Sequence, residues 1–478
     1  MTNFSTTVLL SLLALITSSR GAAEGFVAKS ATSSVSSLRP TFVSFRGGQV
    51  EAAATDVPSW ESLESELETL QQSEEKKAPV LTLYRDTNGW CPFCERVWVA
   101  IRAKNLPYQE TLVPLQGKPE WYKQMVPTGL VPAVLFHGDD ENATSRELVW
   151  ESDAILEALD AKFPDTVQLM KKGDPAFDEA LELQDKLQSA GFKFAYGNRE
   201  GTLTEEEIQA NRENFESALD ELDAALGKQA EASGTTSCFR LGKEFSGIDA
   251  IMIPTLERWR YQLPLTENLD ILENRSHLKN WFDTMDSYDA YGLRVAGDEY
   301  SWTATASQFL RYFGGGEDKP KVAEGIARAD AAAEQLAQDF VSNMAVGGQQ
   351  KEAALEAAAK LIGNHEAVVA DCVREEPISQ KHIPRAGSKE TADVLLRHVS
   401  SLLLQMAGTE DSTSETMVSV PTDFNESEIE QGALALQTVS KRLCVPRDMG
   451  APSAALLRGL LSSVAETLKT EKADAVVA

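Results

Sequence analysis

The sequence predicts an α/β domain followed by a part that contains only helices. Four short β-branched or aromatic segments alternate with helical segments between residues 80 and 163. Beyond Pro164 these strand patterns stop, and apolar residues recur at spacings of three and four. A chain of 478 residues is also too long for one compact core. The order of the first part, strand, helix, strand, two strands and a helix, is that of a thioredoxin-like domain.

The elements of this first domain follow from short sequence patterns. The third strand contains Pro132 near its start, and because proline cannot donate a backbone hydrogen bond, this position fits an edge strand or the start of a strand. Two helices are expected, at 92–104 and 152–163. Strands are expected at 80–84, 108–115, 131–136 and 147–152.

The second domain is predicted to be all-helical. Ser246 and Asp249 have the S-x-x-D spacing of a capping box, and they open a helix that is apolar on most sides and should form the core of this domain. Further amphipathic helices are expected over 174–196 and 204–226. The Gly-rich segment 312–320 ends in proline and is expected to be a linker.

Residues 1–50 are predicted to be a targeting presequence. Residues 8–16 are an apolar run that is long enough for the core of a signal peptide and too short to span a bilayer. A Ser- and Thr-rich basic stretch follows, in which Glu24 is the single acid. With Phe26 after small residues, this pattern resembles the bipartite plastid presequence of algae with complex plastids. A plain secretory signal, which would give a secreted or endomembrane protein, is the alternative.

The domain boundaries are expected as follows. An acidic linker with a solvated helix is predicted before the first domain, and the last part of the chain is rich in Ala, Glu and Leu. The predicted segments are 1–50 for the presequence, 51–78 for the acidic linker, 79–164 for the thioredoxin-like domain, 165–312 for the helical domain and 320–478 for an additional helical region without an assigned function.

Charge excludes two classes of partner. The chain has 45 Lys and Arg against 73 Asp and Glu, a formal net charge of −28. A chain this acidic repels nucleic acid and anionic lipid, so neither nucleic acid nor a membrane is expected as a partner of the mature protein. Five scattered cysteines are too few for a disulfide scaffold. The close pair Cys91 and Cys94 therefore indicates redox or metal chemistry in a reducing compartment.

The motif "CPFC" at residues 91–94 favours a working thiol over its alternatives. A zinc site needs four soft or imidazole ligands, and the sequence has neither a second C-x-x-C nor a paired histidine motif, so no metal is expected. A disulfide between Cys91 and Cys94 would close too small a loop to stabilise the fold much. Cys91 instead precedes a helix with Pro92 in its first turn, where free amides stabilise a thiolate.

Cys94 has two open interpretations. It lies one turn inside the helix on the same side as Cys91, where it could attack a mixed disulfide formed there. Free cysteine also packs well in protein cores, so Cys94 could equally be a small buried apolar residue.

Residues from about Val80 to Arg294 resemble a glutathione transferase of the omega or lambda class, the cysteine-type transferases. Omega and lambda enzymes commonly carry alanine at the position of Cys94, whereas glutaredoxins often have a second cysteine there. The resemblance rests on ordered motifs, which are "CPFCERVW", "GKPEWYKQMVPTGLVPAVL", "WESDAI", "FSGIDAIMIPTLERWRY" and "RSHLKNWFDTMDSYDAY".

The resemblance implies a set of site residues. Cys91 would form a mixed disulfide with glutathione, the co-substrate, and Val131 would pair through its backbone with the cysteinyl part, next to Pro132 in the cis form. Lys118 would approach the glycine carboxylate. The remaining implied glutathione contacts are Glu151 and Ser152 at the γ-glutamyl end, and Phe93 within the motif.

The function expected from these residues is glutathione-dependent thiol transfer or reduction. Glutathionylated proteins and small oxidised acceptors such as dehydroascorbate are the expected substrates, and Cys91 thiolate takes the glutathionyl group. Conjugation of glutathione to electrophiles is the alternative within enzymes, and a non-catalytic binding protein on the same scaffold is the alternative outside them. The resemblance also makes a homodimer an expectation.

Overall fold

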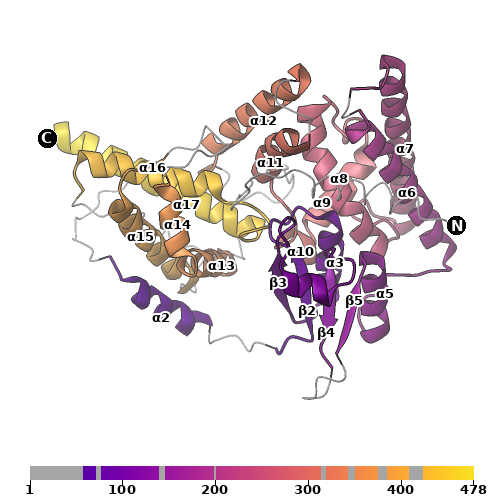
Figure 1. Cartoon of the computed structure of the whole chain (residues 1–478), viewed down its shortest axis with the longest axis horizontal. Helices are drawn as coiled ribbons and strands as arrows, with labels where there is room; N and C mark the ends of the chain where they lie inside the picture. Colours follow the sequence, from indigo (N-terminus) through magenta and orange to yellow (C-terminus); the bar gives the residue numbers. More distant parts are fainter. Residues whose placement is uncertain are drawn as a thin grey trace. The chain divides into compact units, whose positions relative to one another are not determined.

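The computed structural model describes residues 57–71, 77–138, 146–198, 201–313, 319–342, 350–374, 385–408 and 424–477 (Figure 1). The predicted presequence lies outside these residues. The described chain divides into two compact units. Unit 1 contains Lys77–Ala296 and Ala306–Arg328, and unit 2 contains Gly297–Thr305, the described residues after Arg328, and the early helix α2 (Trp60–Gln71). Among the described helices, none has the length and apolarity needed to cross a bilayer.

Unit 1 begins with a four-stranded mixed sheet in the order β3-β2-β4-β5. Strand β2 pairs in parallel with β3 and antiparallel with β4, and β4 pairs antiparallel with β5. The expected α/β fold is confirmed, and each predicted strand and helix is present. The strands are β2 (Leu81–Asp86), β3 (Tyr108–Val113), β4 (Ala133–Phe136) and β5 (Glu147–Trp150), and the helices are α3 (Pro92–Ala103), α4 (Glu120–Met125) and α5 (Ser152–Lys162).

Two details differ from the sequence expectations. Pro132 precedes β4, which is a central strand, so the start-of-strand interpretation is correct and the edge interpretation is wrong. Helix α4 was not predicted, because a helix of six residues is too short to show a helical period. Its Tyr122 is fully buried against the face of the sheet that carries Val113 and Ala133.

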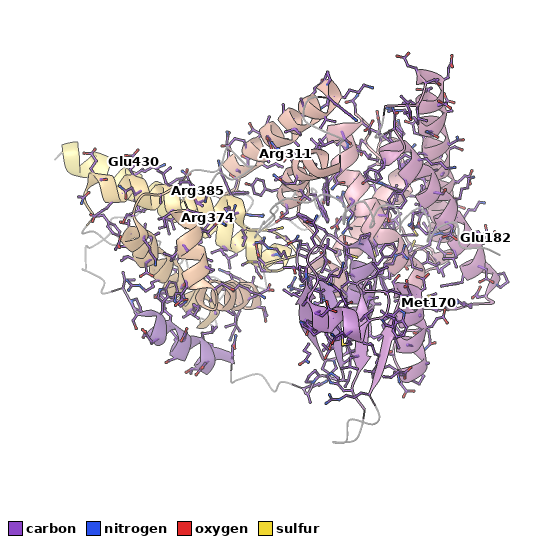
Figure 2. All side chains as sticks on the ribbon, viewed as in Figure 1. Met170, Glu182, Arg311, Arg374, Arg385 and Glu430 are labelled. Atoms are coloured by element: carbon purple, nitrogen blue, oxygen red, sulfur yellow. The ribbon has the colours of Figure 1, made fainter. Side chains whose placement is uncertain are left out.

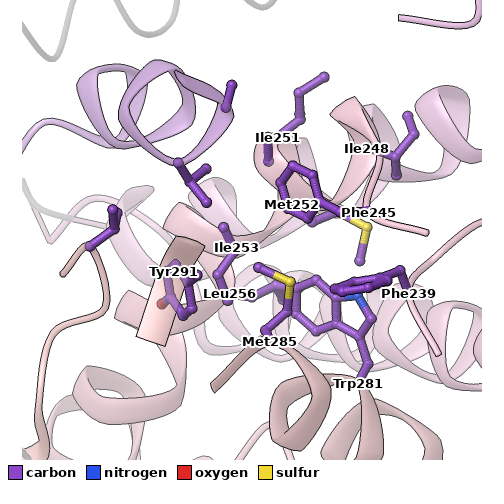
Figure 3. Close-up of a cluster of buried hydrophobic side chains, with 14 of the residues drawn as sticks. Phe239, Phe245, Ile248, Ile251, Met252, Ile253, Leu256, Trp281, Met285 and Tyr291 are labelled. Carbon is purple, nitrogen blue, oxygen red and sulfur yellow. The ribbon is translucent and has the colours of Figure 1, made fainter. Parts of the chain in front are cut away.

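The helical part of unit 1 packs on α3, and α8 forms its centre. Helix α8 is buried along most of its length, as expected from its apolar sequence. The side chains of α8 meet aromatic and sulfur-containing residues of neighbouring segments, including Phe239, Trp281 and Met285 (Figure 3). The helices of this part are α6 (Pro175–Tyr196), α7 (Glu205–Ser233), α8 (Gly247–Thr266), α9 (Ser276–Asp286) and α10 (Asp289–Gly292).

The capping box predicted at the start of α8 is present. Asp249 is fully buried, and its Oδ2 accepts hydrogen bonds from the backbone N–H of Ser246 at 3.0 Å and from the Ser246 hydroxyl at 2.7 Å. Its Oδ1 accepts from the Arg240 N–H and from the indole N–H of Trp281, both at 2.8 Å. One carboxylate thus joins the helix start to two other segments.

Unit 2 is a separate helical bundle with its own hydrophobic core. Helix α13 packs on α15 and α17, and α16 packs on both α15 and α17. The Arg385 side chain, labelled in Figure 2, donates to the backbone carbonyl of Asp371 at 2.7 Å. The bundle contains α13 (Gln350–Ile362), α14 (His365–Cys372), α15 (Lys389–Gly408), α16 (Glu426–Arg442) and α17 (Ala451–Val477), while α11 (Glu299–Phe313) and α12 (Pro320–Gln338) each begin in one unit and end in the other.

Helix α2 differs most from its sequence expectation. It was expected to be a solvated helix that leads into the first domain, but it packs on α13 and α15 of unit 2. Leu63 is fully buried there, and the Trp60 ring stacks on His365 at a centroid distance of 4.3 Å. The Trp60 indole N–H also donates to Asp393 at 2.8 Å. The acidic residues of α2 mark only its outer face.

Candidate active site

The sheet topology brings four chain segments to one of its ends. Strands β2 and β3 are parallel, so the segments that follow Asp86 and Val113 leave the sheet at the same end. Strand β4 runs the opposite way and begins there, directly after Val131 and Pro132. Ala133 pairs with Trp150, so β5 finishes beside the start of β4. The predicted site residues occupy these four segments, although the first of them, Cys91, and the last, Ser152, lie far apart in sequence.

Cys91 lies where the loop after β2 becomes helix α3. It is the N-cap residue of α3, with an extended backbone, and Pro92 occupies the first turn. Its side chain is buried, with 6 % exposed. The Sγ–H donates to the backbone carbonyl of Val131 at 3.8 Å. A sulfur at this point lies close to the free N–H groups and the positive end of the helix, which stabilise a thiolate.

Cys94 lies deeper than Cys91 and has a different environment. It is 1 % exposed, and the backbone N–H of Asp86 points at its sulfur at 3.4 Å. Burial, followed by the interactions with Cys91, raises the pKa of the Cys94 thiol well above its usual value. Cys94 is therefore a neutral thiol in the resting protein.

The segments around the start of β4 and the end of β5 have special backbone geometry. The Val131–Pro132 peptide bond is cis, as the resemblance implies. Glu151 has φ of 71° and ψ of 123°, which is rare for a residue with a side chain, and it is the N-cap residue of α5. Ser152, the first residue of α5, is buried with its N–H at the helix start. The backbone groups there can receive a carboxylate.

Lys118 lies in the segment after β3. Its side chain is half-buried and donates to the backbone carbonyl of Leu115 at 2.9 Å. Burial lowers the pKa of Lys118, and the nearby Cys91 and Cys94 sulfurs oppose this effect. The lysine therefore lies within electrostatic range of the thiol pair. On α4, the Tyr122 hydroxyl donates to the Leu130 carbonyl at 2.7 Å, just before Val131.

The C-x-x-C helix is held by an arginine that sequence reasoning missed. Arg258 on α8 forms a buried ion pair with Glu95 of α3 at 2.7 Å. The same guanidinium donates to the backbone carbonyls of Gly89 at 3.4 Å and Trp90 at 3.1 Å. Trp90 also packs against Phe309 at a centroid distance of 5.4 Å. Arg258 thus ties the loop before Cys91 to the helical part of unit 1, and no local motif marks this role.

A second missed group lies beside Phe93. The Arg96 guanidinium stacks over the Phe93 ring at 5.0 Å and donates to Gln188 at 3.2 Å. It also forms a longer contact of 3.5 Å with Asp153, next to Ser152. Arg96 is thus a buried cation close to the predicted γ-glutamyl end of the site. Its place within the motif that begins at Cys91 was the available sequence signal.

Asp86 is the third missed residue. It ends β2, is fully buried, and its Oδ2 accepts the Trp90 backbone N–H at 2.7 Å. A carboxylate oxygen of Asp86 and the sulfurs of Cys91 and Cys94 lie within 4.8 Å of one another. Three such atoms are one fewer than a closed tetrahedral zinc site needs, and this group has no fourth member among the described residues.

Two family models match the chain. The model for the glutathione S-transferase N-terminal domain matches residues 90–162, and that for the C-terminal domain matches residues 205–284. Protein IN2-1 of Zea mays is 30 % identical over 205 residues, which are 42 % of this chain and 75 % of the relative. The chain belongs to the glutathione S-transferase family. Its expected resemblance to the cysteine-type members is thereby confirmed, and the chain is a glutathione-dependent enzyme of the transferase or oxidoreductase class.

Other relatives of this transferase cover the same region. The probable glutathione S-transferase DHAR2, chloroplastic, of Oryza sativa subsp. japonica is 26 % identical over 214 residues, which are 45 % of this chain and 68 % of the relative. A solved structure, the dehydroascorbate reductase of Chlamydomonas reinhardtii, is 21 % identical, covers 45 % of this chain and 91 % of its own, and has a TM-score of 0.37. The second of the two family models ends at residue 284, so the bundle of unit 2 lies beyond both.

Proposed function

We propose that this transferase is a glutathione-dependent thiol reductase that carries the glutathionyl group on Cys91. The observation that supports this most is the position of the Cys91 sulfur at the start of α3, facing the Val131 carbonyl at 3.8 Å. A thiol at such a place is a nucleophile toward sulfur. The relatives that carry the names DHAR2 and DHAR3 agree with reductive chemistry.

The proposed reaction has two exchange steps. Cys91 thiolate attacks the glutathione sulfur of a mixed disulfide, a bond forms between the two sulfurs, and the substrate leaves as a thiolate that takes up a proton. A second glutathione, as thiolate, then attacks the glutathione sulfur held on Cys91, which releases oxidised glutathione and regenerates Cys91 thiolate. The substrate is thereby reduced at the expense of one reduced glutathione, because the other half of the oxidised glutathione comes from the substrate's own mixed disulfide. Reduction of dehydroascorbate would instead consume two reduced glutathione molecules. Glutathionylated proteins are the primary substrate class, and dehydroascorbate is the small acceptor.

The proposed glutathione contacts follow the four segments at the end of the sheet. Val131 pairs with the cysteinyl backbone beside cis Pro132, and Lys118 attracts the glycine carboxylate. Glu151 and Ser152 receive the γ-glutamyl end at the start of α5. Phe93, beneath the Arg96 guanidinium, completes the set. Glutathione is an anionic tripeptide with a free amino group, so its binding calls for a cation at one end and an acid at the other. Lys118 is the proposed cation and Glu151 the proposed acid.

The decisive substitution is Cys91→Ser. We expect it to abolish reduction of a glutathionylated peptide and of dehydroascorbate, because a hydroxyl is a far weaker nucleophile at neutral pH and cannot form the mixed disulfide. The loss of activity is measured as the rate of turnover with excess glutathione, monitored through the consumption of reduced glutathione.

Cys238→Ser is the matched control, since Cys238 is also a buried free cysteine of unit 1 and should leave turnover within about threefold of the wild type. A Cys91→Ser protein with most of the wild-type rate would disprove the assignment. Activity on an aromatic electrophile without reductase activity would instead favour conjugation.

We also propose that the protein works in a plastid. The support is the signal-like apolar run and the acid-poor, Ser-rich stretch in residues 1–50, together with relatives from Oryza sativa and Arabidopsis thaliana that are named chloroplastic.

A further inference from the structure

Asp86 has a buried oxygen with an unmet hydrogen-bonding capacity. The residue is fully buried, and its Oδ2 accepts the Trp90 N–H at 2.7 Å. Its Oδ1 is inaccessible to solvent and has no hydrogen-bond partner among the described residues. An unpaired buried carboxylate oxygen is unfavourable in a folded protein, so such a group calls for an explanation.

Cys94 is the neighbour that could give the buried Asp86 carboxylate a function. The Asp86 backbone N–H points at the Cys94 sulfur at 3.4 Å, and a carboxylate oxygen of Asp86 lies within 4.8 Å of both the Cys94 and the Cys91 sulfur. A proton donor and a base at such a separation exchange a proton directly after a small side-chain rotation or through one water. The carboxylate, the buried thiol and the nucleophilic thiol therefore form one group.

Cys94 requires a base if it is to react. Only the thiolate is a nucleophile, and burial raises the pKa of Cys94 well above its usual value, so the side chain is protonated near neutral pH. A second thiol of this kind can attack a disulfide on Cys91 only if its proton is removed as it attacks.

Other titratable groups near the pair are unsuited to this role. Glu95 follows Cys94 directly and therefore faces another side of α3, where it is paired with Arg258 at 2.7 Å. Tyr122 is a hydrogen-bond donor whose pKa is raised by burial, and Lys118 is a cation donating to a carbonyl. On β2, Arg85 is directed to the Asp86 backbone carbonyl and to Glu110.

We propose that Asp86 is the proton acceptor that turns Cys94 into the resolving thiol of the Cys91 mixed disulfide, a role that rests on the proposed function of Cys91. In this step the Cys94 proton passes to the Asp86 carboxylate, and the Cys94 sulfur attacks the Cys91 sulfur. The bond between Cys91 and the glutathione sulfur breaks as the Cys91–Cys94 disulfide forms. Glutathione leaves as a thiolate and receives the proton from Asp86. Electrons balance, because one disulfide replaces another.

The test isolates this step in a single turnover. The full chain is oxidised with glutathione disulfide, free thiols are removed, and release of glutathione from Cys91 is followed with time by mass spectrometry at pH 7. We expect the wild type to release glutathione and gain the internal disulfide, and Asp86→Asn, which keeps the side-chain shape, to do so at least about tenfold more slowly. Cys94→Ala is the control that should retain the adduct.

A pH series separates proton transfer from a structural effect. With Asp86 as the acceptor, the wild-type rate should change by less than about threefold between pH 7 and 9, whereas the Asp86→Asn rate should rise about tenfold per pH unit because hydroxide must remove the proton. The titratable and charged groups around this site are the two sulfurs themselves, Lys118 and Tyr122 near those sulfurs, and Arg85 on the Asp86 backbone carbonyl. Glu95, paired with Arg258 on the other side of α3, interacts with Asp86 through its charge alone.

The outcomes are distinct. If Cys94→Ala forms no glutathione adduct on Cys91 and the wild type gains no internal disulfide, the proposed function fails. If the adduct forms but persists with Cys94 free, or if Asp86→Asn releases glutathione as fast as the wild type, the role of Asp86 is overturned while the proposed function stands. Should Asp86→Asn fail to fold, the wild-type profile decides alone: a rate that rises about tenfold per pH unit excludes the internal acceptor.

Discussion

At the scale of single residues, the same side chain has different chemistry in different environments. All five cysteines are free and buried, yet only Cys91 lies at the N-terminal end of a helix in the candidate active site. Burial raises the pKa of Cys372 and of Cys444 to about 12 each. These two thiols belong to the core of unit 2, where a small apolar side chain is sufficient.

This difference predicts the order of alkylation. With iodoacetamide at pH 8, we expect native protein to be modified first at Cys91, whereas Cys372 and Cys444 stay unmodified. When the pH is below the pKa of a thiol, only a small fraction of that thiol is ionised and reactive. At pH 8 this fraction is about one in ten thousand for Cys372 and Cys444, and it grows about tenfold with each pH unit. Peptide mass spectrometry locates the label.

The control is the same reaction in denaturant, where all five cysteines should be labelled. Labelling of Cys372 or Cys444 at the rate of Cys91 in the native protein would contradict the expected environments.

At the scale of elements, polar and apolar contacts decide where a helix belongs. Helix α8 begins at a buried carboxylate that accepts four hydrogen bonds, and its Arg258 anchors the loop before Cys91. Helix α2 is sequence-adjacent to unit 1 but is held in unit 2 by Leu63 and Trp60. Sequence neighbourhood alone would assign α2 to the wrong unit.

The placement of α2 gives a stability prediction. Leu63→Ala should lower the free energy of unfolding of unit 2 by about 2–5 kcal/mol, because it removes a fully buried side chain and leaves a cavity. Hydrogen exchange followed by mass spectrometry should show faster exchange in α13 and α15, on which α2 packs, and unchanged exchange in α8.

Glu64→Ala is the matched control on the same helix, since Glu64 is exposed, and it should change stability by less than about 0.5 kcal/mol. Equal effects of the two substitutions would show that α2 is a solvated helix after all.

At the scale of the whole molecule, the chain joins a transferase to a helical bundle beyond the family models and to a predicted presequence. The two units have separate hydrophobic cores. The net charge of −28 is the basis for the expectation that neither nucleic acid nor anionic lipid is a partner.

The presequence predicts a destination. A fluorescent protein fused behind residues 1–50 should enter the plastid of an alga with a secondary plastid, because the apolar run and the acid-poor stretch provide two successive signals. Phe26→Ala in the same fusion should divert it. Fluorescence microscopy with a plastid marker measures both, and accumulation of the unchanged fusion in the medium or cytosol would count against the proposal.

The sequence by itself determined the order of the four strands and of helices α3 and α5, the capping box of Ser246 and Asp249, and the C-x-x-C pair as candidate reactive thiols. These features are local, because hydrophobic period, caps and a C-x-x-C spacing are set by residues close in the chain. The family motifs then indicated which residues lie around Cys91.

Only the tertiary structure decided the partners of Asp86 and Arg258 and the location of α2. The Cys91 sulfur reaches the Val131 carbonyl, and the Asp86 backbone N–H reaches the Cys94 sulfur, because β2 and β3 end on the side of the sheet where β4 begins. Arg258 reaches Trp90 across 168 positions, and Trp60 reaches Asp393 across 333. Contacts between distant segments depend on how whole elements pack, which no short sequence pattern records.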